Sequence, residues 1–155
     1  MRCSVITGTG SYIPETVIPN SHFLESRFKN PKRENSDKPN RIPIHKPLDT
    51  PIEEIVDKFE ALTGIKERRY ARDDQVASDL ATEAAVKVLE STGTDPETLD
   101  YLLVAHNFGD VPTLGAPPQT VSNISSRVKA NLKIRNPKTI PRDIPQGCPG
   151  WLQAM

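Results

Sequence analysis

Three stretches of the chain repeat apolar residues every three or four positions, which is the spacing of one face of a helix. They cover residues 50–64, 75–91 and 121–132. Gly64 is the last residue of the first stretch and Gly93 follows the second, and glycines in these positions commonly end helices. The first stretch opens with Thr-Pro-Ile-Glu at 50–53, a capping box with proline in the first helical position. We therefore expect three helices.

Short apolar runs outside these stretches predict strands at residues 3–8, 100–106 and 139–144. The second run is nearly continuous, which is typical of a strand buried on both faces. Pro141 is expected to interrupt the third run. Strands that alternate with helices longer than ten residues predict a layered α/β fold with largely parallel pairing. Gly8 and Gly10 predict a close backbone turn, since the third glycine of a dinucleotide fingerprint is missing.

Proline is unusually frequent: the chain has 15 prolines in 155 residues. Four of them lie in residues 26–50 among Lys, Arg, Asn and Ser, where little apolar surface is available to offset the entropy of ordering. This segment is interpreted as a long basic insertion or mobile loop. It could meet an anionic ligand or carrier protein, although a solvated loop is the simpler interpretation.

The composition argues against several other classes of protein. The net charge is zero, so no nucleic-acid or membrane partner is expected. No apolar run reaches the ~18 residues of a membrane span, and the N-terminus lacks the pattern of a signal peptide. Two cysteines cannot form a disulfide framework or a Cys-rich zinc site, and no spacing suggests another metal site. A cytoplasmic location is the default expectation.

Cys148 is the candidate nucleophile. It follows the third predicted strand, and Pro149 behind it suits the first position of a helix. A cysteine at a helix N-terminus meets unpaired N–H groups and the positive end of the helix dipole, which favour thiolate over thiol. The same N–H groups could stabilise an oxyanion after attack on a thioester. Gly147 and Gly150 would leave room for a substrate. The alternative is a small buried cysteine without chemistry.

A nucleophilic cysteine needs a base or a positive partner, and the chain has three histidines. His22 and His45 lie in or near the basic segment. His106 ends the second predicted strand, at the carboxyl edge where α/β proteins place their sites. It is therefore the only local candidate to approach Cys148, and its alternative is a hydrogen-bonded residue at the end of a strand.

Taken together, five segments resemble β-ketoacyl-acyl-carrier-protein synthase III, a thiolase-fold family. They occur in the order found in the family: ITGTGSYIPETVIPN, TGIKERR, ASDLATEAAVKVLESTG, LDYLLVAHN and DIPQGCPGWLQAM. They cover most of the chain apart from residues 26–50. The resemblance is to the N-terminal half of that family, and it implies one half of a layered αβαβα architecture. Residues 1–155 would then form one thiolase-like half-domain.

The resemblance implies that Cys148 accepts an acyl group from an acyl thioester, either acyl-CoA or acyl-carrier protein. A malonyl-carrier protein would then be decarboxylated, and its carbanion would attack the acyl-cysteine. Such enzymes act in fatty-acid or related secondary-metabolite synthesis, need no further cofactor, and form homodimers at full length. The catalytic His and Asn of the family lie in the C-terminal half and have no counterpart here. The chain is thus interpreted as a fragment that is itself inactive.

The sequence departs from the family pattern in one respect that bears on the acyl donor. Leu62 stands where members that use coenzyme A have an arginine, and Lys58 falls near their tryptophan. The donor therefore stays open. Two other functions also stay open: a non-catalytic thiolase-fold assembly subunit, and a thiol hydrolase that uses Cys148 with His106.

Overall fold

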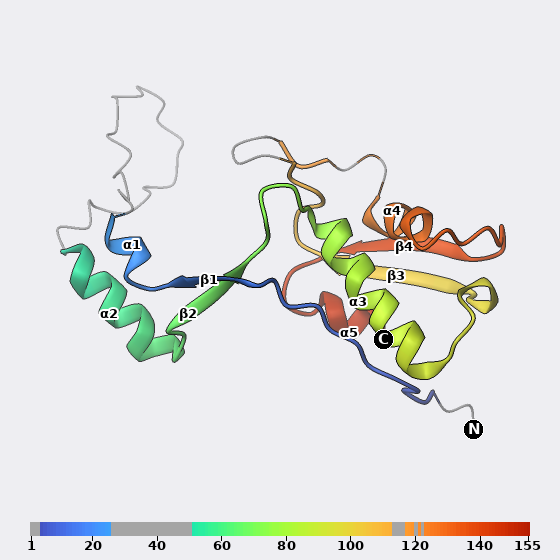
Figure 1. Ribbon diagram of the computed structural model, residues 1–155, viewed down its shortest axis with the longest axis horizontal. Coiled ribbons are helices and arrows are strands. Elements are labelled where there is room, and N and C mark those ends of the chain that lie inside the picture. The colour runs from blue at the N-terminus through green and yellow to red at the C-terminus, as the bar shows by residue number, and fades with distance from the viewer. Residues whose placement is uncertain (1–3, 26–50, 113–116, 120, 122) are drawn as a thin grey trace, which may run out of the picture. The chain divides into compact units, whose positions relative to one another are not determined.

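The computed structural model describes residues 4–25, 51–112, 117–119, 121 and 123–155 (Figure 1). The chain divides into two compact units. Unit 1 combines Met1–Glu15 with Ala71–Met155, and unit 2 is Thr16–Tyr70. Within the described residues, no helix is long and apolar enough to cross a membrane.

A two-stranded parallel sheet forms the centre of unit 1. Strand β3 (Tyr101–His106) pairs with β4 (Ile140–Pro145), with Tyr101 opposite Ile140 and His106 opposite Pro145. The parallel arrangement agrees with the pairing expected from the sequence. It brings the carboxyl ends of both strands to one edge, and Cys148 follows β4 at that edge.

The helices of unit 1 lie on both faces of this sheet. Helix α4 (Ile124–Asn131) receives the side chain of Asp143 at its first turn, while α5 (Gly150–Ala154) lies beside Ala105. Because alternate residues of a strand point to opposite faces, and Asp143 and Ala105 differ by one position in the register, the two helices cover opposite faces. The core includes Ile124, Val128 and Ile134, so it sits under α4.

Helix α3 (Ala77–Thr92) matches the helix expected over 75–91, and Gly93 ends it in the left-handed conformation. The N-terminal segment lies along this helix. A Cβ atom on Gly10 would stand 2.7 Å from Val88 N and 2.8 Å from Ala84 O, and one on Gly8 would collide with Thr92. The two glycines therefore serve close approach to a helix.

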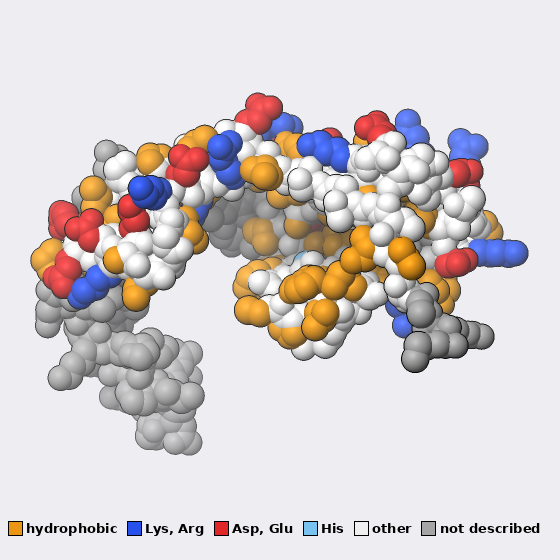
Figure 2. Space-filling view, turned by 90° about the horizontal axis from the view of Figure 1, so that it is seen from below, with side chains coloured by type: hydrophobic (Ala, Val, Ile, Leu, Met, Phe, Trp, Pro, Cys, Tyr) orange, Lys and Arg blue, Asp and Glu red, His pale blue; other side chains and the backbone are white. Residues whose placement is uncertain are grey.

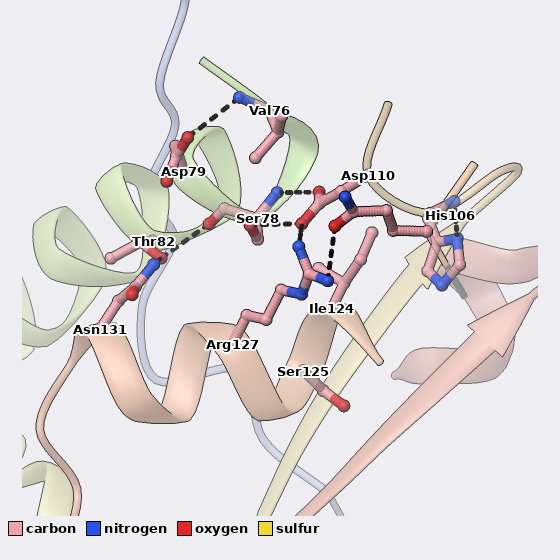
Figure 3. Close-up of polar contacts among 12 residues, drawn as sticks. Val76, Ser78, Asp79, Thr82, His106, Asp110, Ile124, Ser125, Arg127 and Asn131 are labelled. Carbon is pink, nitrogen blue, oxygen red and sulfur yellow. Dashed lines mark hydrogen bonds and ion pairs between the residues drawn. The ribbon is translucent and has the colours of Figure 1, made fainter. Parts of the chain in front are cut away.

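Polar side chains, of which Asp110 and Ser78 are buried, join α3, α4 and the loop after β3 (Figure 3). Asp110 is 1% exposed and accepts hydrogen bonds from Ser78 N at 2.8 Å and Ser78 Oγ at 2.7 Å. Arg127 donates to the same carboxylate at 2.8 Å and to Gln119 Oε1 at 2.8 Å. Asn131 of α4 also donates to Thr82 of α3 at 3.1 Å. Asp110 thus caps α3 from outside the helix and ties it to α4.

A short 3-10 helix (Pro96–Thr98) precedes β3, and its glutamate holds a distant loop. The Asp95 side chain accepts a hydrogen bond from Glu97 N and so caps this helix. The Glu97 carboxylate accepts from Arg135 N at 2.8 Å and Asn136 N at 2.7 Å. These bonds fix the loop between α4 and β4.

The described residues of unit 2 form an antiparallel pair of strands and two helices. Strand β1 (Thr16–Pro19) pairs with β2 (Glu67–Tyr70), α1 is His22–Glu25, and α2 is Ile52–Thr63. Asn20 is 7% exposed and holds the unit together: Nδ2 donates to Ile65 O at 2.7 Å, and Oδ1 accepts from Arg68 at 2.8 Å. Gly64 ends α2 as expected, with φ of 68°. Pro51 occupies the N-cap, and Thr50 lies outside the described residues, as does the 26–50 segment.

Three strand predictions from the sequence are wrong in detail. Residues 4–8 form no strand, because this segment lies along α3 rather than beside another strand, and Val5 and Ile6 are exposed. Strand β3 is not buried on both faces, since Tyr101 is 58% and Leu103 39% exposed. Pro141 does not break β4. Ile140 N donates to Asp100 O, so the next position points away from β3, where a missing N–H costs no ladder bond.

Candidate functional site

Cys148 lies in the turn that joins β4 to α5, and it is exposed. Gly150 N donates to Gly147 O at 2.9 Å, which closes the turn around the cysteine. Pro149 occupies the N-cap of α5 rather than its first helical position. The strand–cysteine–helix order expected from the sequence is present, and the thiol is not enclosed by apolar side chains.

The space around Cys148 is open. An added Cβ on Gly147 would meet no atom within 4 Å. Gly150, in contrast, is buried, and a Cβ there would lie 3.4 Å from Ala105 Cβ. Across the described parts of the chain, the N–H of Cys148 has no hydrogen-bond acceptor. One glycine thus leaves access to the thiol, while the other seats the turn on β3.

His106 does not pair with Cys148. Its Nε2 lies 2.8 Å from Asp143 Oδ2, and its Nδ1 accepts a hydrogen bond from Gly109 N at 2.9 Å. Since an N–H group can only donate, Nδ1 carries no proton and Nε2–H donates to Asp143. Both ring nitrogens are used, so His106 is the hydrogen-bonded residue at the end of a strand. The hydrolase hypothesis required His106 within reach of the thiol and is not supported.

Asp143 is the polar centre of this edge. Its carboxylate accepts hydrogen bonds from His106, from Ile124 N at 2.8 Å and from Ser125 N at 2.8 Å. Burial alone raises the pKa of Asp143, but the hydrogen bonds from Ser125, His106 and Ile124 outweigh it, so the pKa lies below its usual value. The carboxylate therefore stays charged at the N-terminus of α4, where the helix dipole favours a negative charge.

Sequence reasoning overlooked Asp143 and Asp110 as organising residues. A weak signal was present for the first: an acidic residue interrupts the otherwise mostly apolar strand IPRDIP, which suggests a satisfied buried carboxylate. For Asp110 no local signal exists, because its partners Ser78 and Arg127 are 32 and 17 positions away. Only folding brings these three residues together.

Large apolar side chains are exposed on α5, which follows the Cys148 turn, and in the loop after β3. Phe108 is 71% exposed, and on α5 Trp151 is 62% and Leu152 61% exposed. Hydrophobic side chains gather on the face of the molecule that Figure 2 shows.

Among the described residues, no group of three or more His, Cys, Asp or Glu side chains could hold a metal ion. Lys58 and Leu62, which stand at or near the positions of the tryptophan and arginine of members that use coenzyme A, both lie on the surface of α2. Lys58 pairs with Glu54 at 2.6 Å, and Leu62 is 85% exposed. This lysine is therefore part of a solvated i, i+4 pair.

Unit 2 has a pocket of its own, of about 220 Å³. The residues described around it are largely apolar: Asn20, Phe23, Ile55, Val56, Phe59, Arg68 and Tyr70. Arg68 lies over the Phe23 ring, 5.2 Å from its centroid. All of these lining residues belong to unit 2, and none of them is a cysteine.

Comparison with known proteins connects this geometry to one kind of enzyme. No protein-family model matches the chain. The β-ketoacyl-[acyl-carrier-protein] synthase III of Staphylococcus aureus strain JH1 is 33% identical over 150 residues, which is 97% of this chain and 37% of that protein. This chain resembles part of a β-ketoacyl-[acyl-carrier-protein] synthase III. It spans about 37% of the length of the curated relatives it matches.

Solved synthase III structures agree with the sequence comparison. The Thermus thermophilus enzyme superposes with a TM-score of 0.63 at 27% identity, over 97% of this chain and 36% of its own. The Aquifex aeolicus enzyme gives 0.61 at 27% identity, over 96% of this chain and 37% of its own. The expected α/β, thiolase-like fold is thus confirmed for this chain.

Proposed function

We propose that this chain supplies the acyl-accepting cysteine of a β-ketoacyl-acyl-carrier-protein synthase III type of acyltransferase. The observation that carries the proposal is the placement of Cys148: exposed, at the carboxyl edge of a parallel sheet, with open space beside Gly147. The likeness to synthase III over 97% of the chain supports it. The reaction would be a decarboxylating condensation in fatty-acid or related secondary-metabolite synthesis.

In the first half-reaction, the thiolate of Cys148 attacks the carbonyl carbon of an acyl thioester. The carbonyl oxygen becomes an oxyanion, which the N–H of Cys148 would stabilise; this N–H has no acceptor among the described residues. The intermediate then expels the thiol of coenzyme A or of a carrier protein. The acyl group stays on the sulfur of Cys148.

In the second half-reaction, a malonyl-carrier thioester loses CO₂, and its α-carbon becomes a carbanion. This carbon attacks the acyl-cysteine carbonyl, forms the new C–C bond and releases Cys148 as thiolate. The partners of the protein would thus be an acyl thioester, as acyl-CoA or acyl-carrier protein, and a malonyl-carrier protein. A homodimer at full length and a cytoplasmic location belong to the same proposal.

Mass spectrometry of the protein as its gene encodes it tests the first half-reaction. After incubation with a set of acyl-CoA and acyl-carrier thioesters, we expect one acyl mass increment on the peptide that contains Cys148. Cys148→Ala should abolish the increment. Cys3→Ser is the matched control, because Cys3 is the other cysteine of the chain, and this variant should keep the label.

An unlabelled Cys148 with every donor would contradict the proposal. If the protein also co-purified with a larger synthase and Cys148→Ala left the activity of that assembly unchanged, the alternative of a non-catalytic thiolase-fold assembly subunit would be favoured.

A further inference from the structure

His106 and Asp143 form a largely buried pair at the sheet edge from which the Cys148 turn departs. Their side chains are 15% and 12% exposed, and the Nε2–Oδ2 distance is 2.8 Å. They belong to neighbouring strands, so the contact bridges β3 and β4 near the carboxyl ends. Hydrogen bonds between side chains at low exposure hold their geometry better than exposed ones do.

Each member of the pair has further bonds that leave it little freedom. His106 Nδ1 receives Gly109 N–H at 2.9 Å, which folds the loop after β3 back onto the ring (Figure 3). Asp143 receives the N–H groups of Ile124 and Ser125, so it is joined to the first turn of α4. The pair thereby links two strands, one loop and one helix.

The backbone of the same histidine holds the turn that carries the cysteine. His106 O accepts a hydrogen bond from Gln146 N at 3.1 Å, two residues before Cys148. Gly150 then lies against Ala105, the residue before His106. A displacement of His106 would consequently move both ends of the turn.

We propose that His106, held by Asp143, is a positioning residue that sets the location of the Cys148 turn, and that it is not the base of the thiol. The proposal rests on the proposed function of Cys148 as acyl acceptor. Its physical reason is that both ring nitrogens are already engaged, while the carbonyl of the same residue anchors the turn. Misplacing a reacting group by about 1 Å can cost about a hundredfold in rate.

The first experiment measures the protonation of the His106 ring by ¹⁵N NMR in the labelled protein at neutral pH. We expect a neutral ring with the proton on Nε2, because Nδ1 must accept from Gly109 N–H. A doubly protonated ring, as in a thiolate–imidazolium pair, or a proton on Nδ1 would overturn the proposal. This measurement needs no acyl donor, so it gives an answer even if Cys148 proves unable to accept an acyl group.

The second experiment follows single-turnover acylation of Cys148 as a function of pH in three variants. His106→Ala should lower the rate about ten- to a hundredfold without moving the midpoint of the pH profile. His106→Gln should recover most of the rate, since its amide N–H can still donate to Asp143. Asn107→Ala, at the exposed neighbouring position, is the control and should match the parent.

Two results would overturn the proposal. An unchanged acylation rate in His106→Ala would remove the positioning role, and a shifted pH midpoint would identify His106 as a base. Alkylation of Cys148 by iodoacetamide gives the same pH comparison without acyl transfer. A parent protein that is alkylated but never acylated would contradict the proposed function alone, and the alkylation profile would still decide whether His106 acts as a base. If His106→Ala does not fold, the acylation rate of His106→Gln and the protonation of the His106 ring test the proposal instead.

Discussion

Unit 1 contains two contrasting regions: the polar network that joins α3 and α4, and the turn around Cys148. They differ in the burial and hydrogen bonding of their polar groups. In the network, Asp110 and Asp143 each accept hydrogen bonds from residues distant in sequence, and both are largely buried. In the turn, Cys148 is exposed, and a Cβ atom added to Gly147 would have no neighbour within 4 Å. Satisfied groups stabilise the scaffold, and unsatisfied ones stay available for chemistry.

Removal of Asp110 should have the largest effect on stability. Asp110→Ala leaves Arg127 and the N–H and hydroxyl of Ser78 without their shared acceptor. We expect the free energy of unfolding to fall by about 4 kcal/mol, since breaking a buried ion pair from one side costs about 3–5 kcal/mol. Urea denaturation followed by circular dichroism measures it. Asp73→Ala, at an exposed aspartate, is the control, and an equal loss there would refute the explanation.

Removal of Asp143 should cost about 3 kcal/mol, because three donors lose their acceptor. Because the pKa of Asp143 is lowered in the folded state, its charge favours folding above the unfolded pKa of about 3.9, and this contribution is lost as the pH falls through the folded value. The stability difference between parent and Asp143→Ala should be constant from pH 7 to about 5 and shrink below pH 4. A difference that grows on acidification would contradict this sign.

A methyl group placed in the packed region should be costlier than one placed in the open turn. Gly10→Ala brings Cβ within 3 Å of the Val88 and Ala84 backbone, and we expect a loss of about 2 kcal/mol. Gly147→Ala meets open space and should change stability by less than about 0.5 kcal/mol. Parallel thermal melts test the pair. Equal losses would show that the two regions do not differ in packing.

The smallest effect on stability is expected at the cysteine itself. Because Cys148 is exposed, Cys148→Ala should change the free energy of unfolding by less than about 0.5 kcal/mol while it abolishes acylation. Denaturation and acyl labelling of the same sample separate these effects. A large loss of stability would show that the thiol has a structural role.

Local sequence patterns predicted helix α3 and strands β3 and β4 of unit 1. Helix α3 ends at Gly93 as expected, because glycine adopts the left-handed conformation at little cost. Strands β3 and β4 occupy the expected runs, since apolar β-formers bounded by polar residues have little alternative. These features depend on neighbours within a few residues, so one stretch of sequence contains the needed information.

Other features escaped prediction because their causes lie elsewhere in the chain. Residues 4–8 have a strand-like composition, but a strand needs a backbone partner, and this segment lies against α3 instead. The antiparallel pairing of β1 with β2 joins segments about 50 residues apart, and a local hydrophobic pattern does not predict which distant segments pair. Pro141 is tolerated because its side of β4 has no ladder bond to lose.

For the candidate site, the sequence by itself determined which residue could be the nucleophile and that it follows a strand, since both depend on the residues next to Cys148. Tertiary structure alone decided the role of His106. The imidazole could have served the thiol or the scaffold, and folding placed Asp143 and the Gly109 N–H at its two nitrogens. The physical reason is that a hydrogen bond depends on distance and direction in space, which residues from separate segments acquire only when the chain folds.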